Sequence, residues 1–456
     1  VIGGGFTGLA AAAELVRLGR SVTIVEAADQ LGGLAGGFDI GGHELEKFYH
    51  HWFTSDRHIT DLAKRIGASD RIVTRPTRTG MYYSGNFFRM STPLDLLRFN
   101  AIPFHDRIRM GIAALAVRRI KDWRKLESIS AKDWLISWFG ETVYRVVWGP
   151  LLSGKFGRHA DEVSAVWFWN KLALRGASRG SKGQEELAYF LGGFAELARG
   201  VGRYIESLGG KVRTGVKANA IVRQSEAILR VDTTQGAISG RSVLVTTPMP
   251  IAADLLESAA GPDYAASLRH IRYLGNICLV LELDRSLSGL YWTNVNDAAF
   301  PFVGIIEHTN FEPPTSYGGR HIVYLSKYLP TEEPLYNMNA EELLAFSEPH
   351  IKRMFPEFDR AWVKHAYAWR EPYAQPLVVQ RYSEIIPAFD TPLEGVHLAT
   401  MAQVYPEDRG TNYAVREGVI AAGRIHTNLC AKDSCSTRDR VGTAPSLSTG
   451  AALITA

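Results

Sequence analysis

The chain has 456 residues, of which 43 are glycine, 46% are hydrophobic and 21% are charged, with a formal net charge of +4. This length supports a large core without disulfides or metals, and the composition excludes disorder, collagen and coiled coil as the main architecture. The charge is too small to predict a nucleic-acid partner.

The three cysteines are too few and too scattered for a disulfide framework or a zinc site, so we expect a reducing, cytoplasmic setting. No apolar run reaches the ~18 residues of a membrane span. The chain opens on Val1-Ile2 without Met. We therefore expect a few residues of strand before it, and a short targeting segment there would be invisible.

The first predicted unit is strand, helix, strand. Val1-Ile2 ends a buried strand and runs into GGGFTG, a helix follows over residues 9–18, and a strand over 21–25 ends at Glu26. In such a unit the glycines allow a tight turn and close approach of a pyrophosphate to the helix N-terminus, while the acid binds a ribose. An acid disfavours the 2′-phosphate of NADP, so the ligand is FAD or NAD. The predicted cofactor contacts here are Gly3, Gly5, Phe6, Thr7, Gly8, Glu26 and Ala27.

A glycine pair, Gly32-Gly33, follows Glu26 after five residues. Such pairs also form ordinary turns, but this spacing favours a flavin site. It resembles the E-x(5)-G-G signature of the amine oxidase, phytoene desaturase and protoporphyrinogen oxidase superfamily. The resemblance implies that Gly32, Gly33 and Leu34 lie near the flavin side of a bound FAD.

Residues 46–53, EKFYHHWF, occupy the place of a D/E-x-G-x-H element in that superfamily, with Glu46 and His50 matching and Phe48 replacing the glycine. His50 could line the cavity or move protons, because histidine titrates near neutrality. A structural role is an equal alternative. Adjacent histidines seldom chelate one ion, so no metal is predicted.

Two features stand out in the helical region that follows. Residues 105–125 have an apolar centre flanked by Arg and Lys, which suits peripheral membrane contact, although a solvated helix packed on one face is the commoner outcome. Lys155, in the loop WGPLLSGKFG, is predicted to bind an anionic substrate group. Its alternative is a surface lysine lying over an aromatic patch.

The middle of the chain resembles the second cofactor segment of the superfamily. Gly192-Gly193 opens a helix, and a strand leads to Val216, whose backbone the resemblance places against the adenine. A hairpin-like pair of strands is expected over residues 227–233 and 242–247.

The strand-like run 302–311 ends in polar residues, which suggests site chemistry as much as a strand emerging into solvent. The catalytic candidates there are Glu307, His308 and Asn310. Residues 273–277 lack the lysine that monoamine oxidase-like members carry in this region, which weakens a literal amine oxidase assignment.

The last cofactor element is a strand over residues 395–399, a glycine-containing loop over 405–418, and a helix over 419–429. It resembles the C-terminal flavin motif of the superfamily, although the usual acid at the end of the strand is missing and Asp408 is the candidate substitute. The predicted contacts are Asp408, Gly410, Asn412, Tyr413 and Ala414. No cysteine lies in this motif, so a thioether-linked flavin is not expected.

These motifs, in the same order as in the superfamily, predict an α/β fold. It has a discontinuous Rossmann-type FAD-binding domain of the glutathione reductase kind and an inserted substrate domain of mixed sheet and helices. The expected boundaries are 1–75, 185–255 and 385–430 for the cofactor domain, 76–184 and 256–384 for the substrate domain, and 433–456 for a disordered tail.

The resemblance implies an FAD-dependent oxidoreductase that transfers a hydride from a small organic substrate to flavin N5. Two alternatives stay open. One is a UDP-galactopyranose mutase-like flavoenzyme without net redox, and the other is a flavin-binding structural partner.

Overall fold

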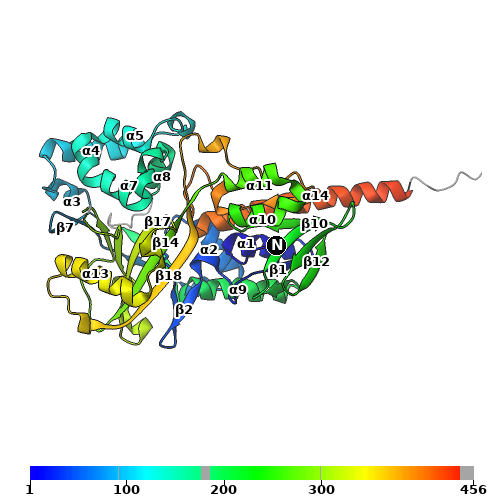
Figure 1. Ribbon diagram of the computed structural model, residues 1–456, viewed down its shortest axis with the longest axis horizontal. Coiled ribbons are helices and arrows are strands. Elements are labelled where there is room, and N and C mark those ends of the chain that lie inside the picture. The colour runs from blue at the N-terminus through cyan, green and yellow to red at the C-terminus, as the bar shows by residue number, and fades with distance from the viewer. Residues whose placement is uncertain (91, 176–184, 298, 442–456) are drawn as a thin grey trace, which may run out of the picture.

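The computed structural model describes residues 1–90, 92–175, 185–297 and 299–441. A parallel sheet with its covering helices forms one side of the elongated molecule, and a larger mixed sheet with a group of helices forms the other (Figure 1). The long helix α14 (Thr411–Val441) projects from the first side.

The parallel sheet is assembled from distant parts of the chain. Strand β1 (Thr23–Val25) pairs with β9 (Lys211–Arg213), and β13 (Val243–Val245) pairs with β19 (Val396–Leu398). Ile2 forms parallel bridges to both β1 and β13, which gives the order β9, β1, Ile2, β13, β19. Strands from the beginning, middle and end of the chain therefore share one sheet.

Helix α1 (Phe6–Arg17) lies at the centre of this side, packed against α9 (Gly193–Ser207) and α14. Its alanines at positions 10 to 13 are completely buried. Small side chains allow neighbouring helices to approach closely, so the alanine run explains the tight packing against α14. Helices α2 (Arg57–Arg65), α10 (Met249–Ala260) and α11 (Pro262–Arg269) complete this side.

The expected hairpin of residues 227–233 and 242–247 is wrong. Strand β11 (Leu229–Thr233) instead pairs on its two sides with β10 (Ala218–Arg223) and β12 (Gly236–Gly240), whereas β13 joins the parallel sheet. All three residues of β13 are buried, as expected for a strand covered on both faces.

The larger sheet has seven strands in the order β18, β14, β17, β16, β15, β6, β7. It is antiparallel except where β15 and β6 run parallel. Alternate residues of β14 face two different cores: Ile277 and Leu279 pack toward α13 (Ala340–Met354), and Cys278 and Val280 toward the other face. The strand bounds are β14 (Tyr273–Leu283), β15 (Trp292–Val295), β16 (Gly304–Glu307), β17 (His321–Leu329), β18 (Val363–Pro376), β6 (Thr79–Tyr83) and β7 (Asn86–Arg89).

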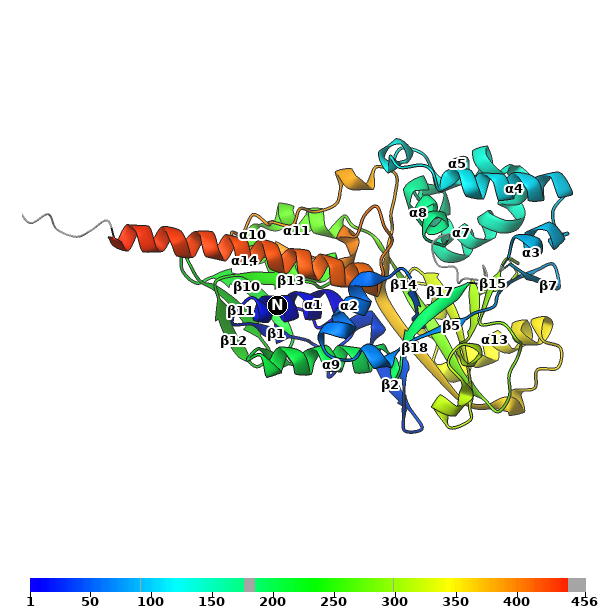
Figure 2. The ribbon, with the colours of Figure 1, turned by 180° about the vertical axis from the view of Figure 1, so that it is seen from behind.

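Smaller strands and helices connect these parts. Strands β2 (Gly37–Ile40) and β3 (His43–Glu46) form a hairpin, and β8 (Glu186–Phe190) lies between β4 (Trp52–Phe53) and β5 (Ile72–Pro76). A separate helical group, seen at the end remote from the tip of α14 in Figure 2, contains α3 (Pro93–Arg98), α4 (Phe104–Val117), α5 (Ala131–Phe139), α6 (Glu141–Val143), α7 (Gly149–Phe156) and α8 (Ala165–Arg175). A single turn, α12 (Pro334–Asn337), precedes α13.

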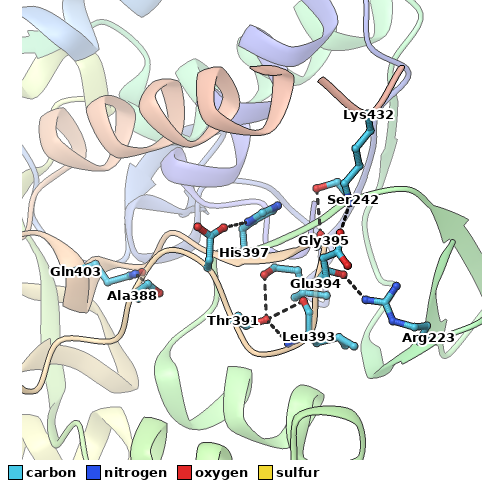
Figure 3. Close-up of polar contacts among 12 residues, drawn as sticks. Arg223, Ser242, Ala388, Thr391, Leu393, Glu394, Gly395, His397, Gln403 and Lys432 are labelled. Atoms are coloured by element: carbon cyan, nitrogen blue, oxygen red, sulfur yellow. Dashed lines mark hydrogen bonds and ion pairs between the residues drawn. The ribbon is translucent and has the colours of Figure 1, made fainter. Parts of the chain in front are cut away.

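The turn before β19 fixes the last strand of the parallel sheet (Figure 3). His397 pairs with Asp390 at 2.7 Å, and the Glu394 carboxylate accepts from Lys432 of α14 at 2.6 Å. Arg223 of β10 donates to the Glu394 carbonyl at 2.6 Å. The turn therefore ties β19 to α14 and to the small antiparallel sheet.

Two expectations concern the C-terminal part. The predicted helix of residues 419–429 is longer at both ends, and part of the expected disordered tail is helical because α14 continues to Val441. Residues 442–456 lie outside the described residues. Within the described ranges, no helix combines the length and the hydropathy needed to cross a bilayer.

Candidate active site

The first glycine turn has the geometry that the motif predicts. Gly3 has φ +106°, a conformation that favours glycine, and a Cβ on Gly8 would lie 2.0 Å from the Gly3 carbonyl oxygen. Helix α1 begins at Phe6 without a side-chain cap. The N–H groups of its first turn, including that of Thr7, therefore point to a place where an anion would be stabilised.

Glu26 is held in place by its own neighbourhood. Its carboxylate accepts from the Gly4 N–H at 2.6 Å and from the Ala28 N–H at 2.8 Å, and Ala27 lies between Glu26 and Ala28 in the sequence. The side chain is half-buried at the end of β1. The oriented oxygens retain lone pairs for the hydroxyls of a ribose.

Val216 approaches the same point from β9. Its N–H donates to the Glu26 carbonyl at 2.9 Å, and its side chain is buried. Because the N–H is engaged, the predicted backbone contact with an adenine would involve the Val216 carbonyl oxygen.

The second glycine pair faces the first turn. Gly32 has φ +118°, its N–H donates to the Gly4 carbonyl at 2.9 Å, and Leu34 lies in the 3-10 turn Gly33–Ala35. A Cβ on Gly5 would meet nothing nearer than the Gly33 Cα at 4.0 Å. This open place between two loops, next to an uncapped helix N-terminus, is a cradle that a side chain would fill, and it fits the pyrophosphate of FAD.

The start of α14 packs directly on the first turn of α1. A Cβ on Gly418 would lie 2.3 Å from the Thr7 carbonyl oxygen, so these helices approach as closely as glycine permits. The Ala414 N–H donates to the Gly410 carbonyl at 2.9 Å, which closes the first turn of α14. Gly410 and Ala414 therefore lie in the neighbourhood of the pyrophosphate cradle.

Two predicted contacts in this motif have other partners. The Asn412 Oδ1 accepts from the Ile59 N–H of α2 at 3.3 Å, so this side chain docks α2 on α14. The Tyr413 ring lies under the Arg416 guanidinium at 4.9 Å. Cofactor contacts by these two residues would involve their backbone or the remaining faces of their side chains.

Asp408 belongs to a buried ionic cluster. Its carboxylate lies 2.5 Å from the Lys171 Nζ and 3.9 Å from the Lys155 Nζ, and it accepts from the Gln375 Nε2 at 3.2 Å. The two lysines and the field of Arg409 hold the pKa of this carboxyl well below its usual range although burial opposes them. These partners engage the carboxylate and do not support the predicted substitution for the ribityl-binding acid.

The rest of the cluster is cationic and aromatic. The Lys155 Nζ lies 4.7 Å from the centre of the Trp167 ring and 5.0 Å from that of Tyr328. Arg409 donates to the Tyr328 hydroxyl at 2.6 Å and to the Gln375 Oε1 at 3.0 Å. Burial lowers the pKa of Lys155 well below its usual value, so this amine is easily neutralised unless an anion accompanies it.

His50 lies near Arg409 of this cluster and against α9. Its Nδ1 lies 2.6 Å from the Phe48 carbonyl oxygen, and its ring packs 5.2 Å from that of Phe194. Burial lowers the pKa of His50 to about 4, so the imidazole is neutral near pH 7. A carbonyl acceptor places the proton on Nδ1 and leaves Nε2 as an acceptor.

The predicted polar cluster at the end of β16 is not one site. The Glu307 carboxylate accepts from the N–H groups of Leu287 and Ser288 at 2.9 and 2.8 Å, and Asn310 donates to the Ser288 and Leu290 carbonyls. Both residues therefore fix the loop of residues 286–290. These contacts do not support a catalytic role for either of them.

His308 points elsewhere, into an aromatic core. Its Nε2 lies 2.7 Å from the Tyr317 hydroxyl, and Tyr189 and Tyr324 contact its ring edge-on. Burial lowers the pKa of His308 to about 3. Among the described residues no protein partner is found for its buried Nδ1.

The same core contains a buried acid, Glu46, to which the sequence motif assigns no role. Its carboxylate accepts from the Tyr189 hydroxyl at 2.8 and 2.9 Å and from the Phe194 N–H at 2.8 Å, and burial raises its pKa to about 7. The Tyr189 side chain that donates to Glu46 also contacts the His308 ring edge-on, so the two residues share a core although 262 positions separate them in the sequence. No group of three His, Cys, Asp or Glu side chains in the described part of the chain is arranged to hold a metal.

Comparisons with known proteins agree with this arrangement. The sequence model of the family described as flavin containing amine oxidoreductase matches residues 6–426. A zeta-carotene desaturase of Zea mays is 29% identical over 189 residues, 36% of this chain and 33% of the maize protein. The chain thus matches about a third of that relative's length.

Solved structures resemble nearly the whole chain. A protein described as a protoporphyrinogen oxidase from Exiguobacterium sp. 255-15 has a TM-score of 0.74 at 19% identity, covering 94% of this chain and 98% of that one. Reduced UDP-galactopyranose mutase has a TM-score of 0.71 at 15% identity, with 93% and 94% covered. Likeness at such identity establishes the fold, and it confirms the predicted α/β architecture with an inserted mixed-sheet region.

Proposed function

The chain belongs to the flavin containing amine oxidoreductase family, and from that premise we propose that it oxidises a small organic molecule by hydride transfer to N5 of bound FAD. The observation that carries the proposal is the open cradle between Gly5 and Gly33, with the start of α14 packed on the same helix turn. Three separate segments of the chain meet there, as one long dinucleotide requires.

The chain's own groups then have distinct tasks. The first turn of α1 binds the pyrophosphate, Glu26 binds the ribose, and the loop of Gly32 to Leu34 lies along the flavin end. His50, neutral and with Nε2 as acceptor, would line the cavity and accept a hydrogen bond from the substrate, because burial disfavours its protonated form. Tyr49, packed edge-on against Trp292 at 4.9 Å, helps to exclude water beside it.

Lys155, Lys171 and Arg409 would bind an anionic group of the substrate. Lys155 and Lys171 lie 3.9 and 2.5 Å from the single carboxylate of Asp408, and the charge of Arg409 also acts on that carboxylate. Lys155 retains 16% and Lys171 39% of its side-chain exposure, so the cluster is not sealed by protein. An additional anion would balance its charge.

The division of the chain follows from these tasks. We propose a cofactor domain of residues 1–75, 185–255 and 385–430, and a substrate domain of residues 76–184 and 256–384. Asp408 and Arg409 would lie where the two domains meet, because they precede α14 and contact α7, α8 and β18.

The decisive measurement is the absorbance of the purified protein. We expect a yellow protein that releases FAD on acid denaturation and bleaches anaerobically with dithionite, since no cysteine lies in the last cofactor motif. Anaerobic bleaching by candidate amines, porphyrinogens and polyenes would then identify the substrate class. A colourless protein that also fails to take up added FAD would contradict the proposal.

Two alternatives predict different results. A mutase-like enzyme without net redox would bind nucleotide sugars only after flavin reduction, seen as a change in the flavin spectrum. A structural flavoprotein would resist reduction by every substrate class and co-purify with a partner. Peripheral contact with a membrane through residues 105–125 is a separate proposal, because it concerns helices outside the cofactor motifs.

A further inference from the structure

Exposed apolar side chains concentrate on one part of the molecule. Among the described residues, eleven large apolar side chains are exposed, and seven of them lie within residues 87–115. Four form an apolar stripe along α4, and the other three lie on α3, which contacts α4, and on β7. The stripe consists of Phe104, Ile108, Ile112 and Leu115, and the other three are Leu94, Leu97 and Phe87.

The stripe is a second apolar face of α4. Its members recur every three or four positions, the spacing of one helix face, and Phe104, Ile112 and Leu115 are 62%, 64% and 64% exposed. The face that packs on the protein is a different one, on which Met110 and Val117 are buried. Packing of α4 therefore leaves the stripe without a partner in the described chain.

The surroundings of the stripe are strongly basic. Residues 87–125 contain nine Arg or Lys against three Asp, a net charge of +6, whereas the whole chain has +4. Of the three acids, Asp106 is buried, Asp95 caps α3 and lies 3.6 Å from the Arg89 guanidinium, and Asp122 lies 3.9 Å from the Lys125 Nζ. The acids therefore neutralise at most three of the nine bases. Exposed Arg119, Lys121 and Lys125 follow directly after α4.

We propose that this face docks on an anionic lipid bilayer, with the apolar stripe inserted among the headgroups and the basic side chains around it contacting lipid phosphates. An amphipathic helix with apolar and basic faces binds membranes in this way. A second copy of the chain is a poorer occupant, because a two-fold interface would bring two regions of charge +6 together.

The position of the helices suits docking. Helices α3 and α4 lie at the end of the molecule remote from the tip of α14, as both views show (Figures 1 and 2). Binding there leaves the cofactor motifs uncovered. The inference therefore does not depend on the proposed reaction, and it is tested without any substrate.

Sedimentation of the FAD-loaded protein with vesicles tests the inference. We expect binding to vesicles of phosphatidylcholine with phosphatidylglycerol and much weaker binding to phosphatidylcholine alone. Raising the salt from about 0.1 M to about 1 M, which shortens the Debye length from about 10 Å to about 3 Å, should weaken binding. The variant Ile112→Glu/Leu115→Glu should reduce the affinity by at least about tenfold.

A matched control separates insertion from a general effect of added acid. Phe346→Glu/Ile251→Glu changes two apolar side chains that are 38% and 37% exposed in other regions, and it should bind vesicles like the wild type. Retained FAD absorbance shows that each variant is folded. Equal binding by both double variants, or no sedimentation with anionic vesicles, would overturn the inference. So would a dimer in light scattering that Ile112→Glu/Leu115→Glu converts to a monomer while vesicles bind no wild-type protein.

Discussion

At the scale of single residues, burial and backbone donors decide the protonation of Glu46. The side chain is 1% exposed, and the Tyr189 hydroxyl and the Phe194 N–H donate to its carboxylate. These donors favour the charged form, but the loss of water outweighs them and raises the pKa to about 7. The hydrogen bonds therefore do not fully offset the cost of removing the charged Glu46 carboxylate from water.

Replacing Glu46 tests this balance through pH. A folded-state pKa above the unfolded value means that stability is full at low pH and is lost as the pH rises through the folded pKa. Glu46→Gln keeps an acceptor for both donors but cannot ionise. We expect the free energy of unfolding of the variant, relative to wild type, to increase between about pH 5 and about pH 8 by up to about 3 kcal/mol.

Urea unfolding of both proteins at the two pH values measures this difference. Glu348→Gln is the control, because its exposed partners Lys352 and Arg360 lower the pKa of that carboxyl instead of raising it. If the free energies of unfolding of wild type and Glu46→Gln differ by the same amount at both pH values, the raised pKa of Glu46 is contradicted.

At the scale of elements, local motifs were predictable and their distant partners were not. The turn at Gly3 and the helix after it are predictable because the glycines that permit the turn and the helix-forming residues that follow are adjacent in the sequence. The pairing of β13 with β19 depends on a strand about 150 residues away in the sequence, and so the hairpin prediction failed. Glu307 and Asn310 have polar side chains, but only the fold reveals that they hold the loop of residues 286–290.

The contact of α1 with α14 gives a prediction at the same scale. A Cβ at Gly418 would lie 2.3 Å from the Thr7 carbonyl oxygen and 3.0 Å from the Ala10 Cβ, so Gly418→Ala must separate the helices. Overpacking of this kind costs about 1–3 kcal/mol. We expect a lower free energy of unfolding in urea and weaker FAD retention, because the first turn of α1 moves.

Gly423→Ala is the control for this substitution on the same helix. A Cβ there meets nothing within 4 Å, and replacing a helical glycine by alanine stabilises by about 1 kcal/mol. The prediction fails if Gly418→Ala is as stable as Gly423→Ala.

At the scale of the whole molecule, the parallel sheet collects strands from the beginning, middle and end of the chain. The predicted FAD contacts are distributed in the same way, from Gly3 to Ala414. A ligand that contacts segments so far apart in sequence binds the folded chain and not the unfolded one. Its binding free energy is therefore added to the stability of the assembled fold.

The cradle at Gly5 allows this coupling to be tested without changing the fold. Gly5 has φ −73° and ψ 175°, which any residue can adopt, and a Cβ there has no contact nearer than 4.0 Å. Gly5→Val should therefore fold but fill the place of the pyrophosphate. At free FAD about one hundredfold above Kd, binding adds about 2.7 kcal/mol, so added FAD should raise the Tm of the wild-type apoprotein and of Gly423→Ala in thermal unfolding. The Tm of Gly5→Val should not respond, and an equal rise in all three proteins would place FAD elsewhere.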